Sequence, residues 1–374
     1  SSAFWQLLEV DARSGEDGML DLTLDTPSWV SHQEFHNGDM RRLGAFVHSI
    51  AFEDGEPQPC YEPTSVTVVI TTFRRWPVLI RTLEALRAQT WDDYDVVVVD
   101  DGSADETWES LQAWQRDRAG TMRLQVYTQT NTGQGIARNH ALKHARGELI
   151  LFIGDDTIPE PDFIEQHVVK HRETGMPCAV VGYTQWDREG MKVTPLLEYV
   201  NEGGHQFGYR YMRDGSDVPY TCFYTSNVSL PREILGTQPF DPNFRTYGWE
   251  DIDLGLRLSR RGLRLIYNAQ ARVHHCHPMV LRDFYVRQIK VGAAIGTMYA
   301  LHPDLVQDPL MPPADRPRLW KRVARLCVPL LLPVVNWLDA RQVRLPERLY
   351  RFVLSDGFWL GRDRAVREQT SRGS

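Results

Sequence analysis

The chain has 374 residues, of which 42% are hydrophobic and 24% charged, and its formal net charge at pH 7 is −7. This length and composition are typical of a folded protein of two or three domains, and the negative charge argues against a dedicated nucleic-acid binder, which usually carries a basic excess. The five cysteines are scattered and odd in number and no signal peptide is visible, so we expect unpaired thiols and a cytoplasmic protein.

Residues 1–60 alternate polar and apolar side chains, a pattern typical of short antiparallel strands. The alternation is clearest at 5–10, 19–24 and 45–52, and proline-rich residues from 56 to 63 indicate a linker. We therefore expect a small β-rich N-terminal module that serves as a structural appendage.

Strand-like and helix-like segments alternate from residue 65 to residue 156. Short continuous apolar runs indicate strands buried on both faces, and apolar residues at helical spacing indicate the helices between them. This alternation predicts an α/β fold with a doubly wound, mostly parallel sheet and right-handed crossovers. The expected strands are 66–73, 94–99, 124–128 and 148–153, and the expected helices are 76–89, 107–118 and 136–144.

Pairs of acids end two of the predicted parallel strands. Asp100 and Asp101 follow one, and Asp155 and Asp156 follow another. Turn preference alone would not place acid pairs at the same end of two parallel strands, and ligands of open α/β sheets bind beyond that end. Carboxylates there suit a hard divalent cation that also carries substrate phosphates.

From residue 159 to residue 280 the pattern is looser. An aromatic and glycine-rich stretch at 196–220 suits either stacking on a sugar or a place in the core, and the sequence leaves both readings open. Further on, Glu250 and Asp251 begin a predicted helix, where carboxylates are favoured. The last strands, 264–267 and 271–273, end at the cluster His274-His275-Cys276-His277, whose spacing is too cramped for all four to bind one zinc ion.

Residues 281–374 are predicted to be mostly helical. From residue 316 to residue 352, arginines are interleaved with leucine, valine and tryptophan. This composition fits either a surface that lies on an anionic membrane or a helical subdomain packed on the rest of the protein. No run of about 18 uncharged apolar residues exists, so membrane contact, if this segment makes it, is expected to be peripheral, at the inner face, rather than through a spanning helix.

Four motifs between residues 65 and 280 resemble, in the same order, those of GT-A-type glycosyltransferases of family 2, which are inverting and use nucleotide sugars. The motifs are Thr71-Thr72-Phe73-Arg74-Arg75, then Val99-Asp100-Asp101-Gly102-Ser103, then Gly133 with Arg138, and finally the acids after residue 153 together with Trp249-Glu250-Asp251. The resemblance implies a GT-A catalytic domain over 61–280, between the N-terminal module (1–60) and the helical C-terminal region (281–374).

The resemblance also implies a nucleotide-sugar site. Asp101 would accept a hydrogen bond from the base, and Arg138 would offer its fork of donors to base or phosphate. A uridine diphosphate sugar is the expected donor, and thymidine and guanosine diphosphate sugars stay open. The implied nucleotide-sugar-binding residues are Thr71, Thr72, Phe73, Arg75, Asp100, Asp101, Gly133, Arg138, Asp155 and Asp156.

A divalent cation, Mn²⁺ or Mg²⁺, is the implied cofactor. Members of the family usually carry Asp-x-Asp after the fourth strand, and here Gly154 stands where the first Asp is expected. Asp156 is then the implied metal ligand and Asp155 its helper, which leaves open how strictly the protein depends on metal. His275 has the best spacing for a further ligand, and His277 is the alternate.

Asp251 matches the position of the family's catalytic base. By resemblance it would take the proton of the acceptor hydroxyl, while Asn227, Trp249 and Glu250 would contact the acceptor, a glycan or a lipid-linked glycan. Two other functions stay open. A nucleotidyltransferase that makes nucleotide sugars would normally need a glycine-rich loop after the first strand, and the altered Asp-x-Asp would suit a non-catalytic sugar-binding protein. The sequence does not define the oligomeric state.

Overall fold

The computed structural model describes residues 29–30, 42–43, 61–118, 120, 122–244, 248–313 and 323–372. The chain divides into two units, Ser1–Pro59 and Cys60–Ser374. In the first unit, strands β1 (Trp29–Val30) and β2 (Arg42–Leu43) pair antiparallel. The strands predicted at 5–10, 19–24 and 45–52 lie outside the described residues.

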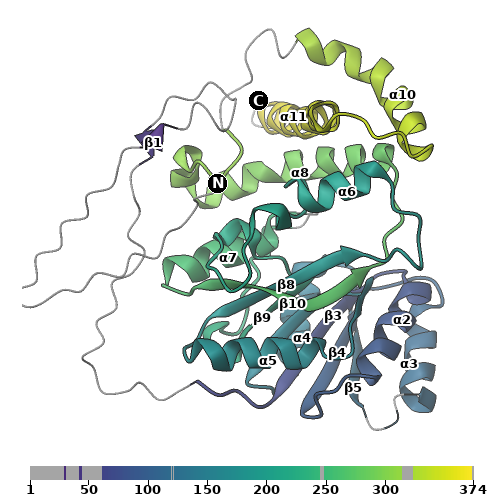
Figure 1. Ribbon diagram of the computed structural model, residues 1–374, viewed down its shortest axis with the longest axis vertical. Helices are drawn as coiled ribbons and strands as arrows, with labels where there is room; N and C mark the ends of the chain where they lie inside the picture. Colours follow the sequence, from purple (N-terminus) through teal and green to yellow (C-terminus); the bar gives the residue numbers. More distant parts are fainter. Residues whose placement is uncertain are drawn as a thin grey trace, which may run out of the picture. The chain divides into compact units, whose positions relative to one another are not determined.

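An eight-stranded sheet with the order β5-β4-β3-β6-β9-β8-β10-β7 forms the centre of the second unit (Figure 1). All strands except β9 and β7 run in the same direction, which confirms the predicted mostly parallel α/β sheet. The strands are β3 (Val66–Thr72), β4 (Tyr94–Asp100), β5 (Arg123–Thr128), β6 (Leu149–Gly154), β7 (Thr157–Pro159), β8 (Ala179–Trp186), β9 (Asn227–Pro231) and β10 (Leu265–His275).

Helices cover both faces of this sheet because alternate strand residues point to opposite sides. In β3, Val68 and Ile70 pack in one buried cluster with residues of α2, α3 and α5. Val69, between them, packs in another cluster with residues of α4 and α7. These helices are α2 (Trp76–Arg87), α3 (Thr107–Arg118), α4 (Gln134–Leu142), α5 (Phe163–Thr174) and α7 (Glu250–Arg260).

The second half of the sheet differs from the prediction in three details. The segments predicted at 264–267 and 271–273 form a single strand, β10, with an irregularity between Asn268 and Arg272. The alternating residues 223–230 predict a strand, and the observed strand β9 begins later, at Asn227. The short strand β7 was not predicted, because three residues are too few to show a periodic pattern.

A helical layer completes the second unit and confirms the predicted helical C-terminal region (Figure 1). Asp339 is buried in this layer, where its Oδ1 accepts hydrogen bonds from the backbone N–H of Leu196 and the hydroxyl of Tyr350, both at 2.8 Å. None of the helices in the described residues is long and apolar enough to cross a bilayer. The layer consists of α6 (Pro195–Glu202), α8 (Leu281–Leu301), α10 (Val328–Ala340) and α11 (Glu347–Arg372).

Helices α8 and α11 touch through glycines. A Cβ atom added at Gly292 of α8 would lie 1.9 Å from the carbonyl oxygen of Phe358, and one at Gly361 of α11 would lie 1.9 Å from that of Ile289. Only glycine allows the two backbones to come this close. Gly296, one turn beyond Gly292, has nothing within 4 Å of its would-be Cβ.

This contact predicts opposite effects for two alanine substitutions in one helix. Gly292→Ala should lower the free energy of unfolding by about 1–3 kcal/mol or more, because the helices must separate. Gly296→Ala should leave it unchanged or raise it by up to about 1 kcal/mol through helix propensity. Denaturant titration followed by circular dichroism measures both variants, and equal effects would contradict the close packing at Gly292.

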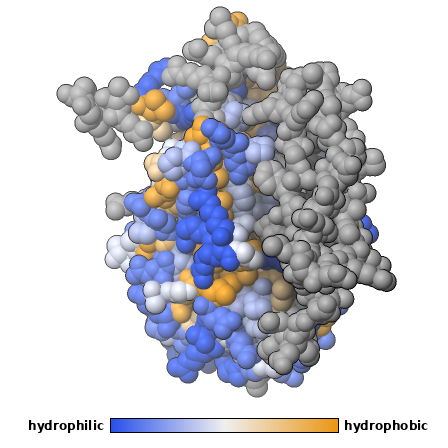
Figure 2. Space-filling model, turned by 90° about the vertical axis from the view of Figure 1, so that its left-hand side faces the viewer, coloured by the Kyte–Doolittle hydropathy of each residue, from blue (hydrophilic) through white to orange (hydrophobic). Residues whose placement is uncertain are grey.

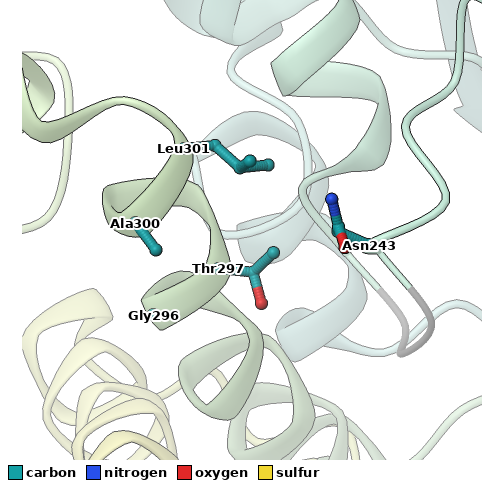
Figure 3. Close-up of a pocket in the computed structure, with 5 residues that line it drawn as sticks. All are labelled: Asn243, Gly296, Thr297, Ala300 and Leu301. Atoms are coloured by element: carbon teal, nitrogen blue, oxygen red, sulfur yellow. The ribbon is translucent and has the colours of Figure 1, made fainter.

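The surface of the described residues is mainly polar on the side shown in Figure 2, with hydrophobic side chains in smaller areas between hydrophilic ones. A hollow of about 310 Å³ lies between α8 and the loop at Asn243 (Figure 3). Its lining residues are Asn243, Gly296, Thr297, Ala300 and Leu301. None of these is a residue that the sequence predicts for the site.

Candidate active site

The backbone brings Asp156 and His275 together although 119 residues separate them. Asp156 follows the carboxyl end of β6, and the chain then turns into β7, which pairs antiparallel with the end of β10. Thr157 is the register partner of His275, and the N–H of Cys276 donates to the carbonyl oxygen of Asp156 at 2.8 Å. The short strand β7 thus fixes the relative position of the two predicted ligands.

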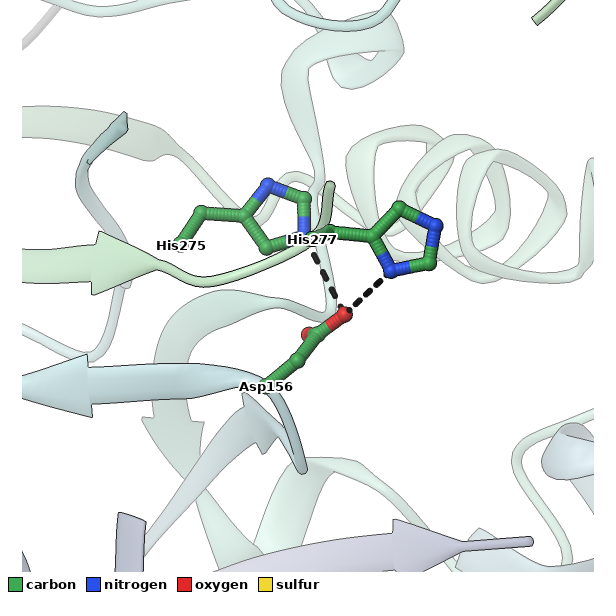
Figure 4. A group of neighbouring side chains, drawn as sticks. All are labelled: Asp156, His275 and His277. Carbon is green, nitrogen blue, oxygen red and sulfur yellow. Dashed lines mark hydrogen bonds and ion pairs between the residues drawn. The ribbon is translucent and has the colours of Figure 1, made fainter. Parts of the chain in front are cut away.

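Asp156, His275 and His277 form a cluster of three ligand atoms that all lie within 4.8 Å of one another (Figure 4). The Oδ2 atom of Asp156 is 3.3 Å from Nε2 of His275 and 3.0 Å from Nδ1 of His277. Ligands about 2.1 Å from one ion are themselves about 3.0–3.4 Å apart in octahedral or tetrahedral geometry. The two distances from Asp156 therefore suit ligands of one divalent cation, and the cluster includes both the predicted histidine and its alternate.

The alternation of strand side chains explains which histidines face Asp156. His275 is buried and stacks on Trp186, with ring centroids 4.9 Å apart and planes at 12°. His274, on the other face, lies 3.3 Å from a carboxylate oxygen of Glu160. The stacking holds the His275 ring in place, so the cluster is ordered by its surroundings.

Arg75 occupies the side of the cluster next to α2. Its guanidinium donates to Oδ1 of Asp155 at 2.8 Å and to Oδ2 of Asp156 at 2.9 Å, and it also contacts Nδ1 of His277. The hydroxyl of Thr72 donates to the other oxygen of Asp155 at 2.8 Å. Arg75 is therefore the cation that neutralises the acid pair in this conformation.

The two adjacent carboxylates differ in acidity. Burial raises the pKa of Asp155 to about 6, although Arg75 opposes the shift. Burial acts in the same direction on Asp156, but His275, His277 and Arg75 outweigh it and hold the pKa of Asp156 well below its ordinary value. Asp156 is thus the carboxylate that stays ionised, as a metal ligand must.

The side chains of Asp100 and Asp101 both accept hydrogen bonds that stabilise turns at the carboxyl edge of the sheet. Asp100 accepts hydrogen bonds from the hydroxyl and the N–H of Ser103. Oδ1 of Asp101 accepts from the side chain of Gln129 and the N–H of Thr132, and its Oδ2 accepts from the N–H of Gly133 at 2.8 Å. A carboxylate oxygen has two acceptor positions, so only Oδ2 of Asp101 keeps one for a ligand N–H. The hydrogen bond between Gly133 and Asp101 thus joins the second and third sequence motifs directly.

The first motif places one aromatic ring at the surface beside these turns. Phe73 is 39% exposed, and the guanidinium of Arg74 lies 4.9 Å from its ring centroid. The N–H of Arg74 donates to the Ser103 hydroxyl at 2.8 Å, which ties this segment to the second motif. Thr71 lies beside Gly154 in the sheet. Phe73 is therefore the side chain of this motif that is free to stack on a planar ligand.

Arg138 and Glu250 form a buried pair. Their side chains are 3.2 Å apart, the amide of Gln134 donates to the same oxygen of Glu250, and both residues are at most 6% exposed. Glu250 is 3% exposed, and its other oxygen, Oε2, is buried with no hydrogen-bond partner among the described residues. Its contact with an acceptor stays a prediction. The ion pair between Arg138 and Glu250 links α4 to the start of α7.

Asp251 lies in the first turn of α7. Trp249 precedes the helix with φ of 75°, and its indole N–H donates to the carbonyl oxygen of Val291 in α8 at 2.9 Å. Burial, and then the charge of Glu250, raise the pKa of Asp251 to about 7, while Arg138 opposes the shift. A carboxylate with a pKa near the working pH is suited to general-base chemistry.

Asn227 is bonded within the sheet, and its contact with the acceptor stays a prediction. The residue is completely buried. Its amide nitrogen donates to the carbonyl oxygens of Tyr183 and Ala271, and its oxygen lies 2.9 Å from Nε2 of His167. All its polar atoms serve to join β8, β9, β10 and α5, which sequence motifs alone do not reveal.

Arg287 of α8 is a residue that the sequence did not single out. Burial lowers its pKa to about 10, the charge of Arg75 adds to this shift, and the charge of Asp156 opposes it. Its guanidinium lies 5.5 Å from the ring of Phe284. The helix therefore brings a second arginine within electrostatic range of the cluster. The sequence carried no signal for this, because it depends on how α8 packs.

Comparisons with known proteins agree with this architecture. The family model for Glycosyl transferase family 2 matches residues 67–234. Validoxylamine A glucosyltransferase of Streptomyces hygroscopicus subsp. jinggangensis is 28% identical over 231 residues, which cover 55% of this chain and 54% of that protein. Glucosyl-dolichyl phosphate glucuronosyltransferase of Haloferax volcanii is 27% identical over 224 residues, which cover 56% and 68%. The chain thus spans about half to two-thirds of the length of these relatives.

A solved structure supports the fold. The mannosyltransferase PcManGT from Pyrobaculum calidifontis, in complex with GDP-Man and Mn²⁺, superposes with a TM-score of 0.56 at 18% identity and covers 84% of this chain and 90% of its own. The mixed sheet with its flanking helices defines a GT-A fold, as the motifs predicted. Within that fold, residues 67–234 match the model of glycosyltransferase family 2.

Proposed function

We propose that this protein is an inverting glycosyltransferase that moves a sugar from a nucleoside-diphosphate sugar to a hydroxyl group of a glycan or a lipid-linked glycan. The observation that carries the proposal is the cluster of Asp156, His275 and His277 at the carboxyl edge of a family 2 sheet. The mannosyltransferase from Pyrobaculum calidifontis was solved with GDP-Man and Mn²⁺ together, which supports a nucleotide sugar as the donor. The sequence motifs suggest a uridine diphosphate sugar, and a guanosine diphosphate sugar is the alternative.

The proposed chemistry divides between the two ends of the site. A divalent cation held by Asp156, His275 and His277 would offset negative charge on the diphosphate leaving group. Asp251 takes the proton of the acceptor hydroxyl while the oxygen of that hydroxyl bonds to the anomeric carbon of the donor. The bond from that carbon to the diphosphate breaks at the opposite face, and the leaving oxygen keeps the electron pair. Arg75 and Arg287 add positive charge near Asp156.

The remaining site residues are proposed to hold the two substrates. Asp101 would accept a hydrogen bond from the base through the free position on Oδ2, and Phe73 would stack on the ring. Trp249 would contact the acceptor beside Asp251. We also propose that residues 316–352 bring the protein to the inner face of a membrane. The name of the Haloferax relative, which includes a dolichyl phosphate, supports an acceptor of that kind.

A panel of nucleotide sugars tests the function. With Mn²⁺ present, we expect one donor to release its nucleoside diphosphate by slow hydrolysis, and faster when an acceptor is added. Chromatography of the nucleotide products measures both rates. A nucleotidyltransferase would instead release pyrophosphate from a nucleoside triphosphate and a sugar phosphate. Failure to turn over any donor, together with failure to bind any nucleoside diphosphate, would exclude the proposed function.

The rate of transfer should depend on pH through Asp251. The base works only when it is ionised, and its pKa is raised to about 7, so the rate should rise as the pH increases through about 7. Glu250→Gln removes the neighbouring negative charge, which lowers the pKa of Asp251, so the rise should move to lower pH. Glu189→Gln, which removes one exposed charge elsewhere, should leave the profile unchanged. A profile that is flat between pH 5 and 8 would contradict this assignment.

A further inference from the structure

One side of α10 and of the turn that leads into it presents a stripe of exposed apolar side chains. Leu326 and Leu330 are 78% and 77% exposed, and the others are 53–58% exposed. Successive members are three or four residues apart, the spacing that places side chains on one face of a helix. We call this stripe the α10 face, and it consists of Val323, Leu326, Leu330, Val334 and Trp337.

The opposite side of α10 is firmly packed. Val328 and Val335 are buried in the cluster that includes residues of α6, α8 and α11. Asp339 ties the end of the helix to Leu196 and Tyr350 through its Oδ1 atom. These contacts fix which side of the helix points outward, so the α10 face cannot turn into the core. In Figure 1, α10 lies at the far side of the helical layer from the sheet.

Positive charge follows the stripe at its carboxyl end. The guanidinium of Arg341 lies 3.8 Å from the ring centroid of Trp337, and Arg344 and Arg348 are exposed beyond it. The acid in the same segment, Glu347, is paired with Arg210 at 3.0 Å. Apolar side chains bordered by tryptophan and arginine are typical of helices that lie in the interface of an anionic bilayer.

We infer that the α10 face inserts into the interfacial region of an anionic lipid bilayer, with Arg341, Arg344 and Arg348 against the headgroups. This inference assigns the proposed membrane contact to particular residues. It rests on the proposed function in one respect, that the acceptor is carried on a lipid. A lipid surface fits better than a protein partner, because the stripe is one helix wide. Each partner in a stable protein interface buries roughly 800 Å², whereas interfacial binding needs only one helix face.

Vesicle co-sedimentation of the full chain tests this inference. We expect binding to vesicles of phosphatidylcholine and phosphatidylserine, weaker binding to phosphatidylcholine alone, and a loss of binding at high salt. Leu330→Ser should weaken the partition coefficient at least about tenfold, because one leucine leaves the bilayer. Leu310→Ser removes a leucine that is 48% exposed outside the α10 face, and it should leave binding unchanged.

A second variant tests the charged border. Replacing Arg341, Arg344 and Arg348 by glutamine should remove the preference for phosphatidylserine. Unchanged vesicle binding by Leu330→Ser would overturn the inference. A lack of vesicle binding by the unaltered chain would also overturn it. If analytical ultracentrifugation then showed that Leu330→Ser converts a dimer to a monomer, the α10 face would be the binding surface for a second copy of the chain.

The outcome is separable from that of the proposed function. Transfer to a soluble acceptor should be equal for Leu330→Ser and the unaltered chain, because the α10 face contains no residue of the site. A protein that binds vesicles but turns over no donor would keep this inference and exclude the proposed function. A protein that transfers sugar but binds no vesicles would keep the proposed sugar transfer and overturn both this inference and the proposed membrane contact.

Discussion

Asp251→Asn should lower the rate of sugar transfer by about two to four powers of ten, the usual contribution of a general base. Asparagine keeps the size and the hydrogen-bonding shape of the side chain but cannot accept the proton of the acceptor hydroxyl. The affinity for the nucleoside diphosphate should change little, because Asp251 lies in α7 and the proposed diphosphate residues lie around Asp156. Single-turnover assays measure the rate, and calorimetry measures the affinity.

The same variant should not unfold more easily. The pKa of Asp251 is higher in the folded protein than in an unfolded chain, so ionising it costs stability. This cost begins above the ordinary pKa of an aspartate near 4 and is complete above about 7. A neutral asparagine avoids it, and the variant should be at least as stable as the unaltered protein at pH 8. A transfer rate close to normal in a folded variant would show that another group is the base.

Asp156→Asn should weaken the binding of Mn²⁺ by more than about 100-fold. Even the loss of a residue that only hydrogen-bonds to a metal ligand commonly lowers metal affinity about 10–100-fold. The substitution removes the carboxylate that both His275 and His277 face. Electron paramagnetic resonance of free Mn²⁺ measures the affinity without any assay of activity.

His274→Gln is the matched control for this measurement. His274 belongs to the same run of histidines but lies beside Glu160 on the other face of β10. We expect its removal to change Mn²⁺ affinity by less than about threefold, within the ordinary spread of substitutions outside a site. Equal losses in His274→Gln and Asp156→Asn, or no loss in either, would show that the ion binds elsewhere.

The sequence predicted the centre of the sheet well, because its strands are buried on both faces and are therefore apolar without interruption. It also predicted that Asp156 and His275 belong together, although through a family resemblance. Strand alternation separates His274 from His275 at the end of β10, because neighbouring strand residues point to opposite faces. That alternation is visible in the sequence itself and could have separated the two histidines.

Other residues could not be placed from the sequence. Asn227 and Glu250 have the polar side chains that a substrate site needs, yet both are buried and bonded within the fold. Whether a polar residue faces a ligand or a neighbouring strand depends on contacts between segments far apart in the chain. Arg287 shows the converse, because an ordinary arginine in a predicted helix gains its importance only from the packing of α8.

The glycine that replaces the usual first acid of the family pattern is itself part of the geometry. A Cβ atom at Gly154 would lie 2.9 Å from Oδ1 of Asp156 and 3.2 Å from Cγ2 of Thr157. A side chain there requires the Asp156 carboxylate, the end of a flexible side chain, to shift by a small amount. An acid at position 154 would therefore add a carboxylate and move the Asp156 carboxylate at the same time. Its effect on the affinity for a divalent cation depends on both residues together and is not the sum of two separate changes.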